Sequence, residues 1–264
     1  MDMNLHNKVA VVTGASRGIG LATVGALATE GVKVVAGSRN GSSELDKLAT
    51  EYDTVSVPGD LSTPEGVEAL VHVAHDRFGG VDVLVNNVAT LTPRLGGFLS
   101  VTDDDWMATL NTNLLSAIRT VRAALPSLIE RKGAIVTISS VNAFLPDPGI
   151  VDYTASKAAL TNFSKALSKE VGPQGVRVNT ISPGPVETDM WLGEGGMAAT
   201  VADAMGVDKE TARERIIESI GGFATGRFTR PDEVADLVVM LASDRTGNIT
   251  GADFVIDGGL IKTL

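Results

Sequence analysis

The stretch "KVAVVTGASRGIG" at residues 8–20 decides the fold. It begins with a Val-rich run that does not alternate polar and apolar side chains, as is typical of a strand buried on both faces. Gly14, Gly18 and Gly20 follow, and a helical pattern covers 19–29. Glycine permits a tight turn and a close backbone approach, and a helix N-terminus offers free N–H groups to a phosphate. The stretch therefore favours a strand, turn and helix that bind a nucleotide over a bare structural turn.

Short apolar runs recur along the chain, and longer helical patterns lie between them. The runs lie at 8–13, 33–37, 54–58, 81–85, 133–139, 176–182 and 252–257, and the helical stretches near 19–29, 43–51, 65–78, 103–131, 152–171 and 231–242. This alternation predicts a doubly wound α/β fold: a seven-stranded parallel sheet with helices on both faces. No long linker or repeat interrupts it, so 1–264 is interpreted as a single domain. The long connection at 184–230, with some helical pattern around 208–220, is typical of a lid or binding loop.

Composition excludes several classes of function. The chain has no cysteine, and of its three histidines His72 and His75 lie three residues apart without a matching third ligand, so no metal site is predicted. The net charge is −10 and no basic cluster is present, which argues against nucleic-acid binding. No apolar run approaches the roughly 20 residues that span a bilayer. The start "MDMNLHNKVAVV" lacks the pattern of a signal peptide, so we expect a cytoplasmic protein without a membrane partner.

The end of the second apolar run bears on the choice of cofactor. In a doubly wound sheet this point faces the adenosine ribose, where an acidic residue would hold the 2′-hydroxyl of NAD. Here the chain has Ser38 and Arg39, with Arg17 in the glycine turn. A guanidinium suits a phosphate, so these residues favour NADP(H) over NAD(H). The alternative is that both are surface arginines.

Further motifs make the chain resemble the short-chain dehydrogenases/reductases, whose fold is of the Rossmann type. They are "TGASRGIG" (13–20), "GDLS" (59–62), "NNVA" (86–89), "NTNL" (111–114), "ISS" (138–140), "YTASK" (153–157) and "NTISPGPVETDM" (179–190). They occur in the order and spacing of that family. One motif departs from it, because Val88 and Ala89 stand where the family usually has alanine and glycine. The 3-oxoacyl-thioester reductases are the members most similar to this chain.

The resemblance implies a role for each matching residue. The cofactor-binding residues would be Gly14, Ser16, Arg17, Gly18, Ile19, Gly20, Ser38, Arg39, Asp60 and Leu61 at the adenosine and pyrophosphate end, Asn87 and Ala89 beside the ribose, and Tyr153, Lys157, Pro183, Gly184, Val186 and Thr188 around the nicotinamide. The catalytic group would be Asn113, Ser140, Tyr153 and Lys157. Taken alone, Asp60 would equally suit a turn cap and Ser140 a strand end.

The chemistry of carbonyl reduction explains the pairing of Tyr153 with Lys157. An alkoxide left by hydride transfer needs a proton, and a free tyrosine has a pKa of about 10, far from the operating pH. Lowering it by about 2–3 units takes roughly 3–4 kcal/mol, and one charge about 4 Å away at an effective dielectric of about 20 supplies about 4 kcal/mol. Residues four apart share a helix face, so Lys157 is expected to lower that pKa. Ser140 would hold the substrate oxygen, and Asn113 would anchor a water that links Lys157 to solvent.

The substrate is left open. Asn142, Phe144 and Trp191 are the predicted substrate-binding residues, although Trp191 would equally suit packing against the sheet. Arg94 would meet an acidic substrate group or lie in solvent. The leading interpretation is an NADP(H)-dependent oxidoreductase acting on a carbonyl or secondary alcohol, and the family resemblance implies a homotetramer. The alternatives are an NAD-dependent alcohol or sugar dehydrogenase and a non-catalytic NADP(H) sensor.

Overall fold

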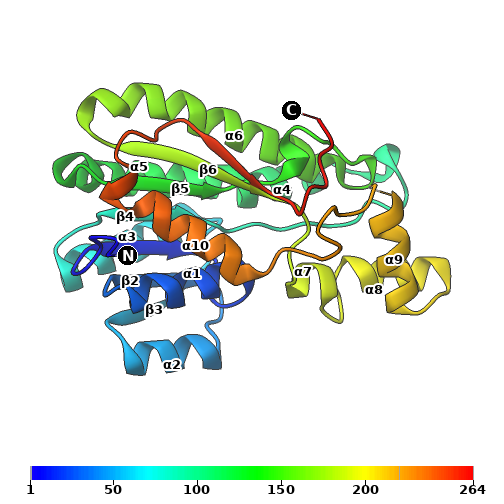
Figure 1. Ribbon diagram of the computed structural model, residues 1–264, viewed down its shortest axis with the longest axis horizontal. Coiled ribbons are helices and arrows are strands. Elements are labelled where there is room, and N and C mark those ends of the chain that lie inside the picture. Colours follow the sequence, from blue (N-terminus) through cyan, green and yellow to red (C-terminus); the bar gives the residue numbers. More distant parts are fainter. Residues whose placement is uncertain (1, 220, 264) are drawn as a thin grey trace.

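A computed structural model describes residues 2–219 and 221–263 and contains a seven-stranded parallel sheet (Figure 1). The strands are β1 (Val9–Thr13), β2 (Lys33–Ser38), β3 (Thr54–Pro58), β4 (Val83–Asn86), β5 (Ala134–Ile138), β6 (Arg177–Pro183) and β7 (Asp253–Ile256). Their order is β3-β2-β1-β4-β5-β6-β7, and every neighbouring pair is parallel. The predicted sheet is thereby confirmed, with the fold-deciding strand β1 in its interior.

Two helical layers cover the sheet. One contains α1 (Gly18–Thr29), α2 (Ser43–Glu51) and α10 (Pro231–Ala242), and the other contains α3 (Pro64–Phe78), α5 (Ser116–Arg131) and α6 (Val151–Val171). Successive residues of a strand point to opposite faces. Ala10 and Val12 of β1 accordingly join the core under the first layer, and Val9 and Val11 join the core under the second. All five residues of β1 are buried, which explains why its sequence lacks alternation.

The helix predicted at 103–131 is interrupted. It consists of α4 (Asp103–Leu110), a π-helical turn at Asn111–Leu115, and α5. A π-turn accommodates one extra residue per turn, and such turns are frequent at functional sites. The interruption includes Asn113, whose side chain is fully buried.

The segment 184–230 is largely helical, where a lid or loop was expected. It contains α7 (Asp189–Leu192), α8 (Met197–Met205) and α9 (Lys209–Ser219), which lie beyond one end of the sheet in Figure 1. The helical pattern predicted at 208–220 is confirmed as α9, and Ile220 lies outside the described residues. The two ends of the segment meet in a parallel bridge between Val186 and Thr229. The buried Phe228 contacts Trp191 at a ring-centroid distance of 5.8 Å. This aromatic contact joins the end of the segment to its beginning.

Two observations bear on membrane and metal binding by the described residues. Within residues 2–219 and 221–263, no helix has both the length and the apolar composition to cross a bilayer. The same part of the chain contains no cluster of three His, Cys, Asp or Glu side chains suited to a metal ion. His72 Nε2 instead lies 3.0 Å from Asp76 Oδ2 on the exposed face of α3.

Candidate active site

A cavity of about 1120 Å³ extends from the glycine turn after β1 to the residues that follow β5 and β6. Ligands of doubly wound sheets bind beyond the carboxyl ends of the strands, where this cavity lies. Most of the predicted site residues line it, namely Gly14, Ser16, Arg17, Gly18, Ile19, Ser38, Arg39, Asp60, Leu61, Asn87, Ala89, Ser140, Asn142, Tyr153, Lys157, Pro183, Gly184, Val186, Thr188 and Trp191. Three predicted site residues, Gly20, Asn113 and Phe144, are not at its surface.

The glycine turn forms the floor at one end. Gly14 and Gly18 have φ values of +67° and +54°, a region that favours glycine. A Cβ atom on Gly14 would lie 3.0 Å from Asn87 Nδ2, and one on Gly18 would lie 3.1 Å from Thr188 Cγ2. Asn87 Nδ2 donates to the Gly14 carbonyl oxygen at 3.1 Å. A Cβ on Gly20 would overlap the Gly14 carbonyl group, so the small size of Gly20 allows the turn to close.

The end of β2 places Arg39 at the cavity with its side chain exposed. Ser38 is buried, and its hydroxyl oxygen accepts from Gly41 N at 3.1 Å, so it shapes the turn after the strand. Arg17 forms only a long, exposed ion pair with Asp189 at 3.8 Å. Arg17 and Arg39 therefore line the same cavity.

The sequence reasoning missed the residues that follow Arg39. Asn40, Gly41, Ser42 and Glu44 also line the cavity, from the turn that leads into α2. Ser42 caps α2 by accepting from Leu45 N at 3.2 Å. The Ser42 cap could have revealed these residues in the sequence, because the N-terminus of a helix that follows β2 must face the same end of the cavity as Arg39.

Asp60 both caps a turn and lines the cavity. Its Oδ1 accepts from Ser62 N at 2.9 Å and from Ser62 Oγ at 2.8 Å. These bonds, and to a lesser extent the charge of Arg39, hold the pKa of the Asp60 carboxyl below its usual range. The interpretation of Asp60 as a turn cap is therefore compatible with its interpretation as part of the wall of a cofactor site.

Ser140 and Tyr153 lie together on the wall opposite the glycine turn. Ser140 lies two residues after the end of β5, and its Oγ accepts from Asn142 N at 3.2 Å. Burial raises the pKa of the Tyr153 phenol above its ordinary value, and hydrogen bonding by Ser140 opposes that rise only in part. The phenol is therefore protonated at neutral pH in the ligand-free protein, contrary to the lowered pKa that spacing suggested.

Lys157 is fully buried, with only 1% of its surface exposed. Its Nζ donates to the Ile138 carbonyl oxygen at 2.8 Å and lies 5.8 Å from the centre of the Tyr153 ring. Burial lowers the pKa of the Lys157 ammonium to about 7. Both members of the pair are thus shifted towards their neutral forms, because loss of hydration disfavours each charge. Spacing predicted their proximity correctly but did not predict this burial.

Asn113 lies one layer behind the cavity. Its Nδ2 donates to the Thr90 carbonyl oxygen at 2.9 Å and to Ser156 Oγ at 3.0 Å, and its Oδ1 accepts from Thr90 N at 2.7 Å. Both amide hydrogens are engaged within the protein. The side chain therefore connects the π-turn, the wall that contains Thr90, and α6.

Two of the three predicted substrate-binding residues, Asn142 and Trp191, line the cavity. Phe144 is 48% exposed and lies outside the cavity, whereas Leu145 and Asp147 line it. Asn142 lies at the surface of the cavity as predicted, and its Oδ1 accepts from the Ser140 hydroxyl at 3.2 Å. Trp191 lines the cavity and packs on Phe228.

Other residues also line this end of the cavity. Met190 and Met197 come from α7 and α8, Ser219 from the end of α9, and Leu260 from the segment after β7. Met190 directly follows "SPGPVETD" (182–189), whereas Ser219 and Leu260 lie 79 and 120 residues beyond Ser140. Only the tertiary fold brings them to the cavity.

Arg94 lies outside the cavity. It forms ion pairs with Asp152 at 2.5 Å and with Asp105 at 2.9 Å, and its side chain is only 11% exposed. Arg94 is therefore not solvated, and it does not line the cavity.

A family model described as enoyl-(acyl carrier protein) reductase matches residues 14–261. With the fold and the cavity described above, this match shows that the chain belongs to the short-chain dehydrogenase/reductase family of oxidoreductases, which act on carbonyl and alcohol groups. The 3-oxoacyl-(acyl-carrier-protein) reductase of Vibrio cholerae serotype O1 is 35% identical over 262 residues, which cover 98% of this chain and 99% of the relative. That of Escherichia coli strain K12 is 34% identical with the same coverage.

Solved structures give the same assignment of family. L-sorbose reductase from Gluconobacter frateurii, in complex with NADPH and L-sorbose, is similar with a TM-score of 0.90 and 34% identity over 100% of both chains. A dehydrogenase/reductase from Sinorhizobium meliloti 1021 has a TM-score of 0.83 and 32% identity over 98% of this chain and 97% of that one.

Proposed function

We propose that this protein catalyses the NADPH-dependent reduction of a ketone on an uncharged substrate, and the reverse oxidation of the alcohol. The observation that carries the proposal is one cavity that contains the glycine turn and Arg39 at one end and Ser140, Tyr153 and Lys157 at the other. A nucleotide site alone would not need a buried phenol and amine beside each other, since burying both disfavours their charged forms.

The cavity fits a dinucleotide. Gly14 and Gly18 leave space that a Cβ atom would fill, and the N-terminus of α1 directs free N–H groups at the same place. Arg39 and Arg17 would hold the 2′-phosphate, Asp60 the adenine, and the segment Pro183–Thr188 the nicotinamide. Bound NADPH would supply the hydride. The G. frateurii L-sorbose reductase, which contains NADPH, supports this choice of cofactor.

The residues of the chain would then manage the proton and the oxygen. Ser140 would donate a hydrogen bond to the carbonyl oxygen of the substrate, where negative charge develops. Tyr153, protonated because its pKa is raised, would give its proton to that oxygen. Lys157, whose pKa is about 7, would return a proton to the phenolate and take one from solvent through a water near Asn113.

Charges at the substrate end favour an uncharged substrate. Among the described residues, the cations that line the cavity are Arg17, Arg39 and Lys157, and two of them lie at the adenosine end. Arg94 is held by two aspartates, and Asp147 contributes negative charge instead. An acidic substrate, or docking of an acidic acyl carrier protein to a chain of net charge −10, would meet repulsion. The segment 184–230 would supply the apolar wall that selects the substrate.

The test uses Tyr153→Phe with Tyr52→Phe as its matched control, because Tyr52 is the other tyrosine and lies outside the cavity. NADPH consumption is followed with L-sorbose, uncharged ketones and 3-oxoacyl thioesters. We expect Tyr153→Phe to lose about 100-fold or more of kcat while NADPH still binds, in line with the size of acid catalysis. Full turnover in that variant would refute the mechanism.

The same panel separates the alternatives. Faster turnover with NADH would support an NAD-dependent dehydrogenase, and tight NADPH binding without turnover of any substrate would support a sensor. A preference for 3-oxoacyl thioesters over every uncharged ketone would contradict the proposed substrate class.

We also propose that the protein forms a homotetramer. Leu95, Phe98, Leu99 and Met107 are exposed apolar side chains close in sequence at and before α4, as a subunit interface would require. Light scattering of the purified protein measures its mass directly, and a monomer would contradict this expectation.

A further inference from the structure

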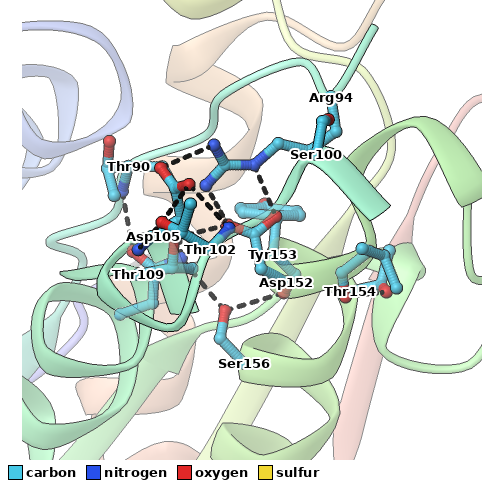
Figure 2. A network of polar contacts seen from close by, with 12 residues as sticks. Thr90, Arg94, Ser100, Thr102, Asp105, Thr109, Asp152, Tyr153, Thr154 and Ser156 are labelled. Atoms are coloured by element: carbon cyan, nitrogen blue, oxygen red, sulfur yellow. Dashed lines mark hydrogen bonds and ion pairs between the residues drawn. The ribbon is translucent and has the colours of Figure 1, made fainter. Parts of the chain in front are cut away.

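A buried ion pair lies directly beside the proposed proton donor (Figure 2). Asp152 precedes Tyr153 in the first turn of α6, and its side chain is only 1% exposed. Arg94 donates to it from Nη2 at 2.5 Å and from Nε at 3.2 Å, which is a two-point contact with fixed geometry. No step proposed above uses either residue.

Further contacts make the pair part of a rigid junction. Thr109 Oγ1 on α4 donates to Asp152 Oδ2 at 2.6 Å, and Arg94 Nη1 donates to Asp105 Oδ1 at 2.9 Å. Asp105 is itself held by Thr102 in a capping box at the start of α4. Arg94 N donates to the Gly149 carbonyl oxygen at 2.7 Å, which connects the segment before α6 as well.

The network closes on the residues of the proposed chemistry. Ser156 Oγ donates to the Tyr153 carbonyl oxygen at 2.7 Å and accepts from Asn113, which holds the Thr90 backbone. Arg94 lies four residues after Thr90 on the same segment. Figure 2 shows these side chains converging from that segment, α4 and α6. The cavity wall at 87–91 and the first turn of α6 are thus joined at two points.

Stability alone explains this arrangement poorly. Removing two charges from water is costly, and well-packed apolar residues often stabilise a protein as much as a buried ion pair does. A bidentate guanidinium–carboxylate contact does fix the distance and orientation of two backbone segments. We propose that Arg94 and Asp152 are positioning residues, which hold the 87–97 segment against α6 so that the Tyr153 phenol and the cavity wall keep their productive geometry. The inference rests on the proposed function, because it acts through Tyr153.

The test measures kcat, KM for the best ketone, the Kd of NADPH and the urea midpoint for Arg94→Met, Arg94→Lys and Asp152→Asn. We expect Arg94→Met and Asp152→Asn to lower kcat by about 10- to 100-fold, the range for a misplacement of about 1 Å, with the Kd of NADPH changed less than about twofold. Arg94→Lys should recover part of kcat, because lysine restores the charge but not the two-point contact.

Arg131→Met is the matched control. It also breaks a partly buried ion pair, from Arg131 Nη1 to Asp82 Oδ2 at 3.2 Å, but at the opposite end of the strands. It should lower the urea midpoint and leave kcat unchanged. A purely structural role for Arg94 would give the same pattern for Arg94→Met, and that result would overturn the inference.

Two outcomes separate this inference from the proposed function. Wild-type kcat in both Asp152→Asn and Arg94→Lys, together with an inactive Tyr153→Phe variant, would overturn the positioning role and leave the function standing. Full activity of Tyr153→Phe would overturn both. Should Arg94→Met fail to fold, the two conservative variants decide the matter, since Asp152→Asn keeps an oxygen to accept from Thr109.

Discussion

The buried Lys157 makes the stability of the ligand-free protein depend on pH. An exposed lysine has a pKa of about 10.4, whereas burial lowers the pKa of Lys157 to about 7. Between these values the unfolded chain binds more protons than the folded one, so the free energy of unfolding rises as the pH rises. The slope from this one group is about 1.4 kcal/mol per pH unit, which gives about 2 kcal/mol between pH 7 and 9. Tyr153 does not contribute in this range, because its pKa is raised.

The perturbation is Lys157→Met, which keeps an unbranched apolar side chain and removes the titration. Its control is Lys47→Met, which alters an exposed lysine on α2. Urea unfolding of the ligand-free proteins at pH 7, 8 and 9, at one protein concentration, gives the free energies. We expect Lys157→Met to gain stability relative to wild type at pH 7, and this gain to shrink by about 2 kcal/mol by pH 9. Lys47→Met should show no such trend.

A difference between Lys157→Met and wild type that stays constant from pH 7 to 9 would refute the reasoning. It would mean that the bond from Lys157 Nζ to the Ile138 carbonyl oxygen compensates for the lost hydration of the ammonium. The proton return proposed for Lys157 near neutral pH would then lose its basis.

Three further variants test other parts of the structure. Arg39→Asp should raise the Kd of NADPH by about 10- to 100-fold, the worth of a charged hydrogen bond, and improve NADH binding; fluorescence titration measures both. Gly18→Ala should destabilise the fold by about 1–2 kcal/mol, because φ at this position is +54°. The added Cβ would also contact Thr188 and weaken NADPH binding. An unchanged free energy of unfolding in urea and an unchanged Kd of NADPH would contradict this prediction. Phe228→Ala should cost about 3–5 kcal/mol by removing the buried ring beside Trp191, as thermal or urea unfolding would show.

Helix bounds follow the sequence closely where capping residues mark them. The structure begins α3 at Pro64 after the Thr63 cap, whose Oγ1 accepts from Gly66 N at 3.1 Å, and ends it before Gly79, which has φ of +80°. The prediction of 65–78 differs by one residue. Proline at a first turn and glycine in the left-handed region are local preferences, so no tertiary contact is needed to place these ends.

The π-turn at Asn111–Leu115 and the helix α8 escape such reasoning. The sequence "DDDWMATLNTNLLSAIRT" continues a helical pattern through the π-turn, and the extra residue is held by the bonds from Asn113 to Thr90 and Ser156, which come from other elements. The helix α8 contains small residues such as Ala198 and Ala202, which are buried only once α8 packs against α7 and α9. The local hydrophobic periodicity therefore predicts neither the π-turn nor α8.

The sequence predicts the order of strands and helices and the glycine turn. It also predicts the arginines that follow the first two strands and the Tyr153–Lys157 pair, because each of these features depends on neighbours within one turn or strand. The tertiary structure alone decides the state of those groups. It buries Lys157 and Tyr153 together, so that both shift towards neutrality, and it closes Arg94 onto Asp152 across 58 residues of chain. Hydration and long-range pairing depend on which surfaces meet in space, and residue spacing does not encode that.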